Sequence, residues 1–195
     1  MFFIPSSMRI IAGKYRSRIL KSLKGLALRP TSDRLRETLF NVLGPSVAGS
    51  RFLDVFGGTG AVGIEALSRG AAHVTFLENH APAAKLIRQN LDSLKIATGY
   101  TILAADALTS LQKLAARHTP STPPYDLVFV DPPYANHADY TRTLDILATA
   151  NFLAPDAVLI FEHHHKFQLP ESAGQLTRTR LLKQGDATLT FFISS

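Results

Sequence analysis

The chain of 195 residues has no cysteine and no run of apolar residues long enough to span a membrane. The first absence excludes disulfides and thiolate metal sites, and it removes the nucleophile that methylation at C5 of a pyrimidine requires. The opening residues also lack the basic region and the apolar stretch of a signal peptide. We therefore expect a soluble cytoplasmic protein with one α/β domain, because this length is too short for two.

Acidic residues are nearly absent from one stretch near the N-terminus. Between Arg9 and Arg36 the sequence has nine basic residues and one acidic residue, Asp33, although the formal net charge of the whole chain is only +6. We expect residues 1–7 to be a disordered extension and residues 8–30 to form a basic arm or hairpin ahead of a domain over residues 31–195. Such a basic end indicates a polyanionic partner, although a solubilising tail would have the same composition.

Short apolar runs alternate with segments of helical spacing from Arg51 onward, which is typical of βαβ units and a parallel sheet. The expected strands are Arg51–Val55, His73–Leu77, Tyr100–Leu103, Asp126–Val130 and Ala157–Phe161. The expected helices are Ala61–Arg69, Pro82–Lys95, Leu108–Ala116 and Asp139–Ala150, preceded by one that contains Leu35, Leu39, Val42 and Leu43. Two further runs, Arg180–Lys183 and Ala187–Ile193, leave no room for a helix between them and predict a closing antiparallel hairpin.

A glycine-rich turn follows the first expected strand, and its residues are Phe56, Gly57, Gly58, Thr59 and Gly60. Glycines there let the backbone turn sharply and approach a ligand, at the strand end where open α/β sheets bind ligands. Residues 58–63 also match the dinucleotide pattern G-x-G-x-x-G, so an NAD-dependent oxidoreductase is an alternative. Asp54 argues against it, because a carboxylate beside the turn would repel a pyrophosphate but suits the cationic groups of S-adenosylmethionine.

Acidic residues also end the next two expected strands. Glu78, followed by Asn79, stands where a carboxylate can accept both ribose hydroxyls of an adenosine cofactor of either class. Asp106 stands where an acid can meet the adenine amine, and it is the weakest of the three acids because exposed acids are common at strand ends. The candidate cofactor-binding residues are therefore Asp54, Phe56, Gly57, Gly58, Gly60, Glu78, Asn79 and Asp106.

The tetrapeptide Asp131-Pro132-Pro133-Tyr134 directly follows the fourth expected strand. An exocyclic amine on a nucleobase is a poor nucleophile, and two fixed acceptors for its hydrogens would favour the tetrahedral geometry that methylation needs. The Asp131 carboxylate and the Pro132 carbonyl can supply these acceptors, while the prolines remove competing N–H donors. Tyr134 offers a flat face on which a flipped base can stack. An ordinary Asp-Pro turn is the alternative for the tetrapeptide taken alone.

With these residues identified, the chain resembles the bacterial 16S rRNA guanine-N2 methyltransferase family from Met8 onward. The resemblance rests on Arg9–Gly13, Leu28–Glu37, Asp54–Gly70 and Asp131–Tyr134. It implies a Rossmann-like class I methyltransferase domain with a mostly parallel seven-stranded sheet, S-adenosylmethionine as methyl donor, and a guanine of 16S rRNA in an assembling or assembled small subunit. The sequence departs from the family at Ser17 in the basic arm and at Gly57 and Thr59 in the glycine loop.

Six cationic residues are candidates for contact with RNA phosphates, which supply affinity and register without identifying the base. They are Arg9, Lys14, Arg16, Arg18, Arg34 and Arg36. Adenine-N6 methylation of DNA or RNA is the main alternative function, because the same tetrapeptide serves either amine. A non-catalytic RNA-binding module is a further one, although it would have no use for the cofactor loop. We expect a monomer, since no element shows an additional apolar face.

The run Glu162-His163-His164-His165 could suggest a metal site. These residues follow an expected strand, where adjacent side chains point to opposite faces, so we do not expect the three imidazoles to converge. No metal is therefore expected.

Overall fold

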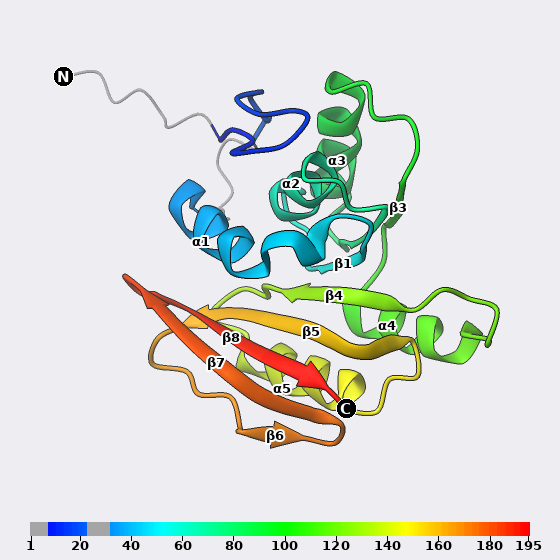
Figure 1. Cartoon of the computed structure of the whole chain (residues 1–195), viewed down its shortest axis with the longest axis vertical. Helices are drawn as coiled ribbons and strands as arrows, with labels where there is room; N and C mark the ends of the chain where they lie inside the picture. Colours follow the sequence, from blue (N-terminus) through cyan, green and yellow to red (C-terminus); the bar gives the residue numbers. More distant parts are fainter. Residues whose placement is uncertain (1–7, 23–31) are drawn as a thin grey trace.

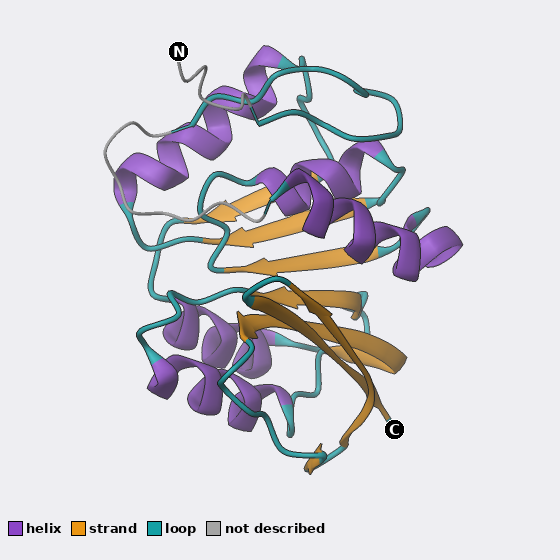
Figure 2. Ribbon diagram, turned by 90° about the vertical axis from the view of Figure 1, so that its left-hand side faces the viewer, coloured by secondary structure: helices purple, strands orange, loops and turns teal. Residues whose placement is uncertain are grey.

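The computed structural model of the chain describes residues 8–22 and 32–195. The expected extension over residues 1–7 lies outside these ranges, as do residues 23–31, which include part of the expected arm. The described chain forms one sheet of eight strands in the order β3-β2-β1-β4-β5-β8-β7-β6, with helices on both faces (Figures 1 and 2). Among the described residues, no helix combines the length and the apolarity needed to cross a membrane.

The sheet has a parallel half and an antiparallel half. The parallel strands are β1 (Arg51–Val55), β2 (His73–Leu77), β3 (Tyr100–Leu103), β4 (Tyr125–Val130) and β5 (Leu153–His164). The antiparallel strands are β6 (Ser172–Ala173), β7 (Leu176–Gln184) and β8 (Ala187–Ser194). The expected mostly parallel sheet with a closing hairpin is confirmed. The short strand β6 was not expected, and it brings the sheet of the described residues to eight strands, where seven were expected.

In the described part of the chain, five α-helices cover the sheet, and one short 3₁₀-helix follows the first of them. They are α1 (Asp33–Leu43), α2 (Ala61–Ser68), α3 (Ala81–Ser93), α4 (Ala107–Arg117) and α5 (His137–Leu147), with the 3₁₀-helix at Gly44–Val47. Side chains of α1, α2 and α3 pack in one hydrophobic cluster, and side chains of α4 and α5 pack in another. The Ser32 side chain accepts a hydrogen bond from the Leu35 N–H and so caps the start of α1.

The two clusters lie on opposite faces of the sheet because successive strand residues point in opposite directions. In β1, Phe52 belongs to the cluster with α1–α3, and Leu53 and Val55 belong to the cluster with α4 and α5. The same division separates Phe129 from Val128 in β4. Burial on both faces explains why these strands are nearly continuous apolar runs.

The order of the strands determines where a ligand can bind. From β1 the chain proceeds to β2 and β3 on one side, and then crosses back to β4 and β5 on the other side. The carboxyl ends of β1 and β4 are therefore neighbours, with Val55 paired to Val130. Ligands of open α/β sheets bind at such a switch point. The glycine loop and the Asp131–Tyr134 turn both begin there.

Candidate active site

The glycine loop between β1 and α2 has a tightly constrained backbone. Phe56, Gly58 and Gly60 have φ angles of +66°, +53° and +77°, in the region that favours glycine. A Cβ atom on Gly60 would lie 3.1 Å from the Ile87 side chain, whereas a Cβ on Gly58 would meet nothing closer than the Phe56 carbonyl oxygen at 3.8 Å. The loop thus packs closely against α3 at Gly60 and is more open at Gly58.

Asp54 lies beneath the glycine loop, and its side chain is buried. Its carboxylate accepts a hydrogen bond of 2.9 Å from the Gly63 N–H in the first turn of α2, a position where a helix stabilises negative charge. Burial raises the pKa of Asp54 to about 7, against the opposing effect of the Gly63 hydrogen bond. This carboxylate therefore holds the start of α2, and its expected contact with a cofactor cation stays a prediction.

Glu78 ends β2 beside the same loop. One carboxylate oxygen accepts a hydrogen bond of 2.7 Å from the Gly58 N–H, and the other accepts one of 2.7 Å from the His80 N–H. Asn79 is exposed, and so is Asp106, whose side chain caps α4 by accepting from the Thr109 N–H at 2.8 Å. The acids thus follow neighbouring strands along one edge. Two carboxylates around an open loop fit an adenosine-containing cation chemically.

The Asp131–Tyr134 turn is tied to the glycine loop through β1, because the Asp131 N–H donates to the Val55 carbonyl oxygen at 3.3 Å. Pro132 is buried, Pro133 is exposed, and Asp131 and Tyr134 are half-buried. The structure therefore brings the expected catalytic turn and the expected cofactor loop to adjacent strand ends. The catalytic roles expected of these residues stay a prediction.

Two buried residues, Tyr140 and Glu162, support this turn, a role that the sequence did not predict for either. The Tyr140 hydroxyl lies 3.1 Å from both the Pro132 and the Glu162 carbonyl oxygens, and the Tyr134 hydroxyl donates to the Glu162 carboxylate at 3.2 Å. Burial, with Asp131, Tyr134 and Glu162 nearby, raises the pKa of Tyr140 well above its usual value, so its hydroxyl stays a donor. The Pro132 carbonyl, a predicted acceptor for the substrate amine, therefore already receives one hydrogen bond, from Tyr140.

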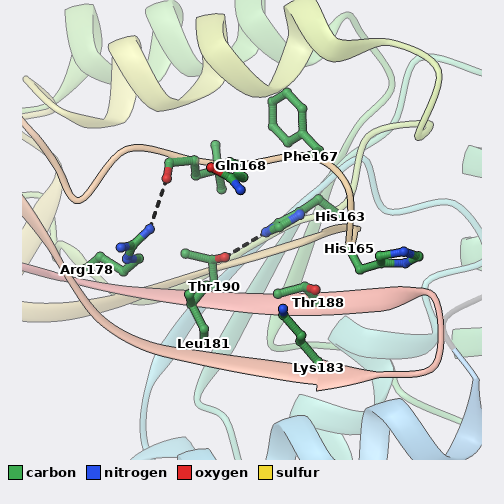
Figure 3. Close-up of a pocket in the computed structure, with 10 residues that line it drawn as sticks. His163, His165, Phe167, Gln168, Arg178, Leu181, Lys183, Thr188 and Thr190 are labelled. Atoms are coloured by element: carbon green, nitrogen blue, oxygen red, sulfur yellow. Dashed lines mark hydrogen bonds between the residues drawn. The ribbon is translucent and has the colours of Figure 1, made fainter.

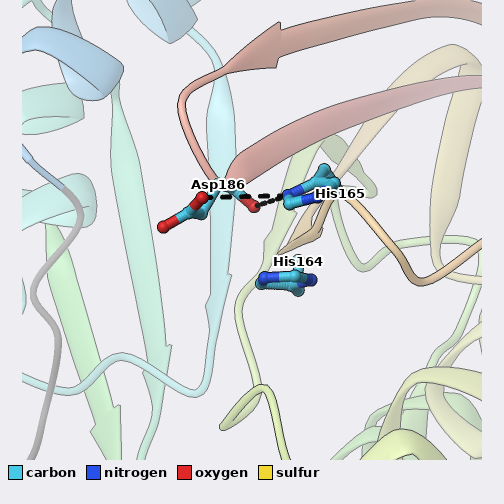
Figure 4. Close-up of side chains that lie close together, drawn as sticks. All are labelled: His164, His165 and Asp186. Atoms are coloured by element: carbon cyan, nitrogen blue, oxygen red, sulfur yellow. Dashed lines mark hydrogen bonds and ion pairs between the residues drawn. The ribbon is translucent and has the colours of Figure 1, made fainter.

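The three consecutive histidines separate into two groups. His163 is buried, whereas the rings of His164 and His165 lie 4.3 Å apart near Asp186 (Figure 4). The expectation that neighbouring imidazoles would point apart is wrong for this pair, because β5 ends at His164 and the alternation ends with it. Ligand atoms of the pair and of Asp186 lie within 4.8 Å of one another. Donor atoms on a tetrahedral zinc are about 3.3 Å apart, so these side chains would have to move closer to bind one.

Residues 8–22 form a basic arm that folds back on itself. Arg9 forms an antiparallel bridge with Ile19, the Ile10 N–H donates to the Arg18 carbonyl oxygen at 3.0 Å, and the Leu20 N–H donates to the Met8 carbonyl oxygen at 2.8 Å. Of the six candidate phosphate contacts, those with exposed side chains are Arg9, Lys14, Arg16, Arg18 and, on α1, Arg34. Five of the six candidate phosphate contacts are thus available on the surface.

Arg36 does not fit the expected role in phosphate contact. Its side chain is fully buried, and its guanidinium donates to the Arg9 carbonyl oxygen at 2.6 Å and to the Asp33 carboxylate at 2.8 Å. Burial lowers its pKa, against the attraction of Asp33 and Glu65. Arg36 therefore joins α1 to the arm. Its predicted role in phosphate contact is wrong, and its role is structural.

Polar residues of α2 attach the arm to the domain. Their role was not predicted from the sequence. The buried Glu65 carboxylate accepts hydrogen bonds from the Ile11 N–H at 2.8 Å and the Ala12 N–H at 3.0 Å, and it pairs with Arg69 at 2.7 Å. The Ser68 hydroxyl accepts from the Tyr15 N–H at 3.0 Å. A charged residue within the otherwise apolar Ala61–Leu67 segment was the available signal for this attachment.

Asn90 on α3 joins the arm to the glycine loop. Its amide oxygen accepts from the Lys21 N–H at 2.8 Å, and its amide nitrogen lies 3.2 Å from the carbonyl oxygens of both Lys21 and Thr59. The Thr59 hydroxyl also contacts the Met8 sulfur at 3.6 Å. The arm and the loop therefore share direct contacts.

The fold and this arrangement of strand ends are those of class I methyltransferases, whose methyl donor is S-adenosylmethionine. The structure of yhhF from Escherichia coli matches with a TM-score of 0.82 and 33% identity, over 97% of this chain and 98% of that one. SMU.776, solved in complex with S-adenosylhomocysteine (SAH), matches with a TM-score of 0.65 over 82% of this chain and 48% of that one. At 16% identity this second likeness concerns the fold alone.

Sequence comparison identifies the family. The family model described as "Conserved hypothetical protein 95" matches residues 8–193. The ribosomal RNA small subunit methyltransferase D of Haemophilus influenzae is 39% identical over 156 residues, which are 80% of this chain and 78% of that protein. The chain belongs to this methyltransferase family, and the resemblance inferred from its motifs is confirmed.

Proposed function

We propose that the protein transfers a methyl group from S-adenosylmethionine to the N2 amine of a guanine in 16S rRNA. The observation that carries this proposal is the position of the Asp131–Tyr134 turn, one strand from the glycine loop and joined to it by the Asp131–Val55 hydrogen bond. The name of the Haemophilus influenzae relative supports small-subunit rRNA as the substrate. The exposed cations of the basic arm supply affinity for phosphates.

The turn holds the amine through its two hydrogens. The Asp131 carboxylate accepts one of them, and the Pro132 carbonyl accepts the other through the lone pair that Tyr140 leaves unused. With both hydrogens held, the nitrogen lone pair is directed away from the base and toward the glycine loop. The Tyr134 ring, whose hydroxyl is fixed by Glu162, stacks against the flipped base.

The chemistry needs only a positioned amine and an acceptor for one proton. When bound, S-adenosylmethionine supplies an electrophilic methyl group on a sulfonium leaving group. As the nitrogen–carbon bond forms and the sulfur–carbon bond breaks, the nitrogen becomes strongly acidic. Asp131 takes its proton and passes it to water, which returns the carboxylate to its charged state.

The experiment that tests this function uses labelled S-adenosylmethionine and small ribosomal subunits that lack the modification. We expect label on N2 of one guanine of 16S rRNA, located by mapping the product nucleotide. Label on adenine N6 would replace the guanine proposal with the alternative amine, and label on protein alone would exclude RNA as the substrate. Calorimetric binding of NAD in place of S-adenosylmethionine would instead support an oxidoreductase.

A further inference from the structure

A pocket lies beside the proposed active site, where the chain leaves β5 and passes over β8 and β7. It has a volume of about 210 Å³, and Figure 3 shows the side chains from β5, β7, β8 and the segment after β5 that line it. Phe167 forms one wall, and its ring also packs against Tyr140 at 4.8 Å between ring centroids. Because Tyr140 supports Pro132, the pocket borders the residues that hold the catalytic turn.

Three adjacent strands supply the polar floor of this pocket. Thr188 on β8 is paired with His163 on β5 and with Lys183 on β7, so the three side chains project from the same face of the sheet. Both ring nitrogens of His163 have hydrogen-bond partners within the protein, one 2.7 Å from the Thr190 hydroxyl and the other 3.0 Å from the His164 carbonyl oxygen. Burial lowers the pKa of His163, which favours its neutral form.

The Thr188 hydroxyl differs from its neighbours in the floor. Thr188 is 2% exposed, and within residues 8–22 and 32–195 its Oγ1 atom has no hydrogen-bond partner. Buried side-chain hydroxyls are paired in the large majority of cases, so an unpaired one on a residue that lines a pocket is a candidate donor to a polar ligand. A hydroxyl can donate to an anionic oxygen.

Arg178 and Lys183 line the pocket, and none of the described residues that line it carries a carboxylate. Arg178 donates to the Leu169 carbonyl oxygen at 3.1 Å and to Glu171 at 2.9 Å, which keeps its guanidinium at the pocket. Lys183 is exposed and has no acidic partner within 4.0 Å in the described part of the chain. Leu181, 46% exposed, adds an apolar surface beside these cations. Since Glu171 neutralises Arg178, Lys183 supplies the uncompensated positive charge, and a cation beside an apolar surface fits the phosphate and sugar of a nucleotide.

We propose that this pocket is a second RNA subsite, which holds a phosphate of the strand flanking the target nucleotide through Lys183 and Thr188. The inference rests on the proposed function and deepens it. Neighbouring strands are about 4.8 Å apart, so β7 lies roughly 14 Å from β4 across β5 and β8. A strand whose target base is turned into the active site can span this distance along the sheet edge. The RNA then contacts the domain at the arm and at this subsite.

The test compares Thr188→Val and Lys183→Ala with Lys113→Ala, which removes an exposed lysine from α4 that does not line the pocket. The Kd for undermethylated small subunits should rise about tenfold in each pocket variant, since each loses one contact to a charged group. Lys183→Ala should also reduce the slope of affinity against salt by about one. Thr188→Val should retain its melting temperature, because its hydroxyl has no partner to lose. The affinity for S-adenosylmethionine should not change.

The outcomes separate this inference from the proposed function. If wild type methylates RNA and both pocket variants bind it as Lys113→Ala does, the subsite is refuted and the function stands. If wild type transfers no methyl group to RNA, the function itself fails. If guanosine monophosphate binds the pocket but RNA affinity is unchanged in the variants, the pocket is a site for a free nucleotide, and the RNA assignment is overturned.

Discussion

Substitution of Glu65 by glutamine should release the basic arm while leaving the domain folded. The carboxylate accepts two backbone hydrogen bonds from the arm, at Ile11 and Ala12, and it also pairs with Arg69. A glutamine amide has one acceptor oxygen, and its NH₂ group would face an N–H donor. Hydrogen bonds to charged groups contribute about 1.5–3 kcal/mol each, whereas a neutral one contributes about 1 kcal/mol. Attachment of the arm should therefore weaken by roughly 2–4 kcal/mol.

Amide hydrogen exchange measures this release directly. A loss of roughly 2–4 kcal/mol should raise the open population of the arm, and hence the exchange rates of the Ile11 and Ala12 amides, by about 30- to 900-fold. Amides in β1 and β4 should exchange as in wild type. Glu37→Gln, on the exposed side of α1, is the matched control because it removes the same charge without touching the arm.

The same variant should bind RNA more weakly, because the cations of the arm lose their fixed positions. The cofactor affinity should change less than the RNA affinity. Unaltered exchange at Ile11 and Ala12 would refute the reasoning, since it would mean that Glu65 does not hold the arm. Faster exchange throughout the domain would show general destabilisation instead.

Three further predictions concern the centre of the site. Asp131→Ala should abolish methyl transfer with RNA binding retained, as measured by filter binding beside a labelled-donor assay; substantial remaining activity would exclude Asp131 as the acceptor. Tyr140→Phe should leave the Pro132 carbonyl without its donor, lower kcat about tenfold and cost about 1–3 kcal/mol of stability, with the KM for cofactor unchanged. An unchanged kcat would make Tyr140 merely structural. Asp54, whose pKa burial raises to about 7, binds its proton more tightly in the folded state, so its contribution to stability is fully present below about pH 4 and is lost as the pH rises through 7. In Asp54→Asn, this change of roughly 4 kcal/mol in the free energy of unfolding between these pH values should be absent. Stabilities of wild type and variant that change equally with pH would contradict this.

Patterns in the sequence predicted the parallel half of the sheet well and the antiparallel half less well. The bounds of β1, β2 and β3 agree with prediction, because buried parallel strands are continuous apolar runs. β5 begins four residues earlier than predicted, at Leu153, across a segment with Pro155 and a positive φ of 58° at Asp156 that disfavours a strand by local propensity. β7 begins at Leu176 in a largely polar segment, whose pairing with β8 cannot be seen in its own composition.

In the site, residues that form contiguous motifs were predicted, and residues that depend on contacts between distant parts of the sequence were not. Asp131 and the glycine loop were recognised because each motif is contiguous in the sequence. Tyr140, Glu162 and Glu65 were missed because their contacts depend on tertiary packing, as between Glu65 and Ile11, which are 54 residues apart. Arg36 was misassigned because a charge count does not reveal which face of α1 is buried.

The Asn90 side chain makes the arm and the glycine loop thermodynamically dependent on each other. A single amide bonds Lys21 in the arm and Thr59 in the loop, so a shift of either partner changes the bonding available to the other. If RNA binds the arm as proposed, this amide is a direct route by which a change in the arm can alter the loop. Since such coupling is reciprocal, a bound cofactor must favour RNA by the same factor by which bound RNA favours the cofactor.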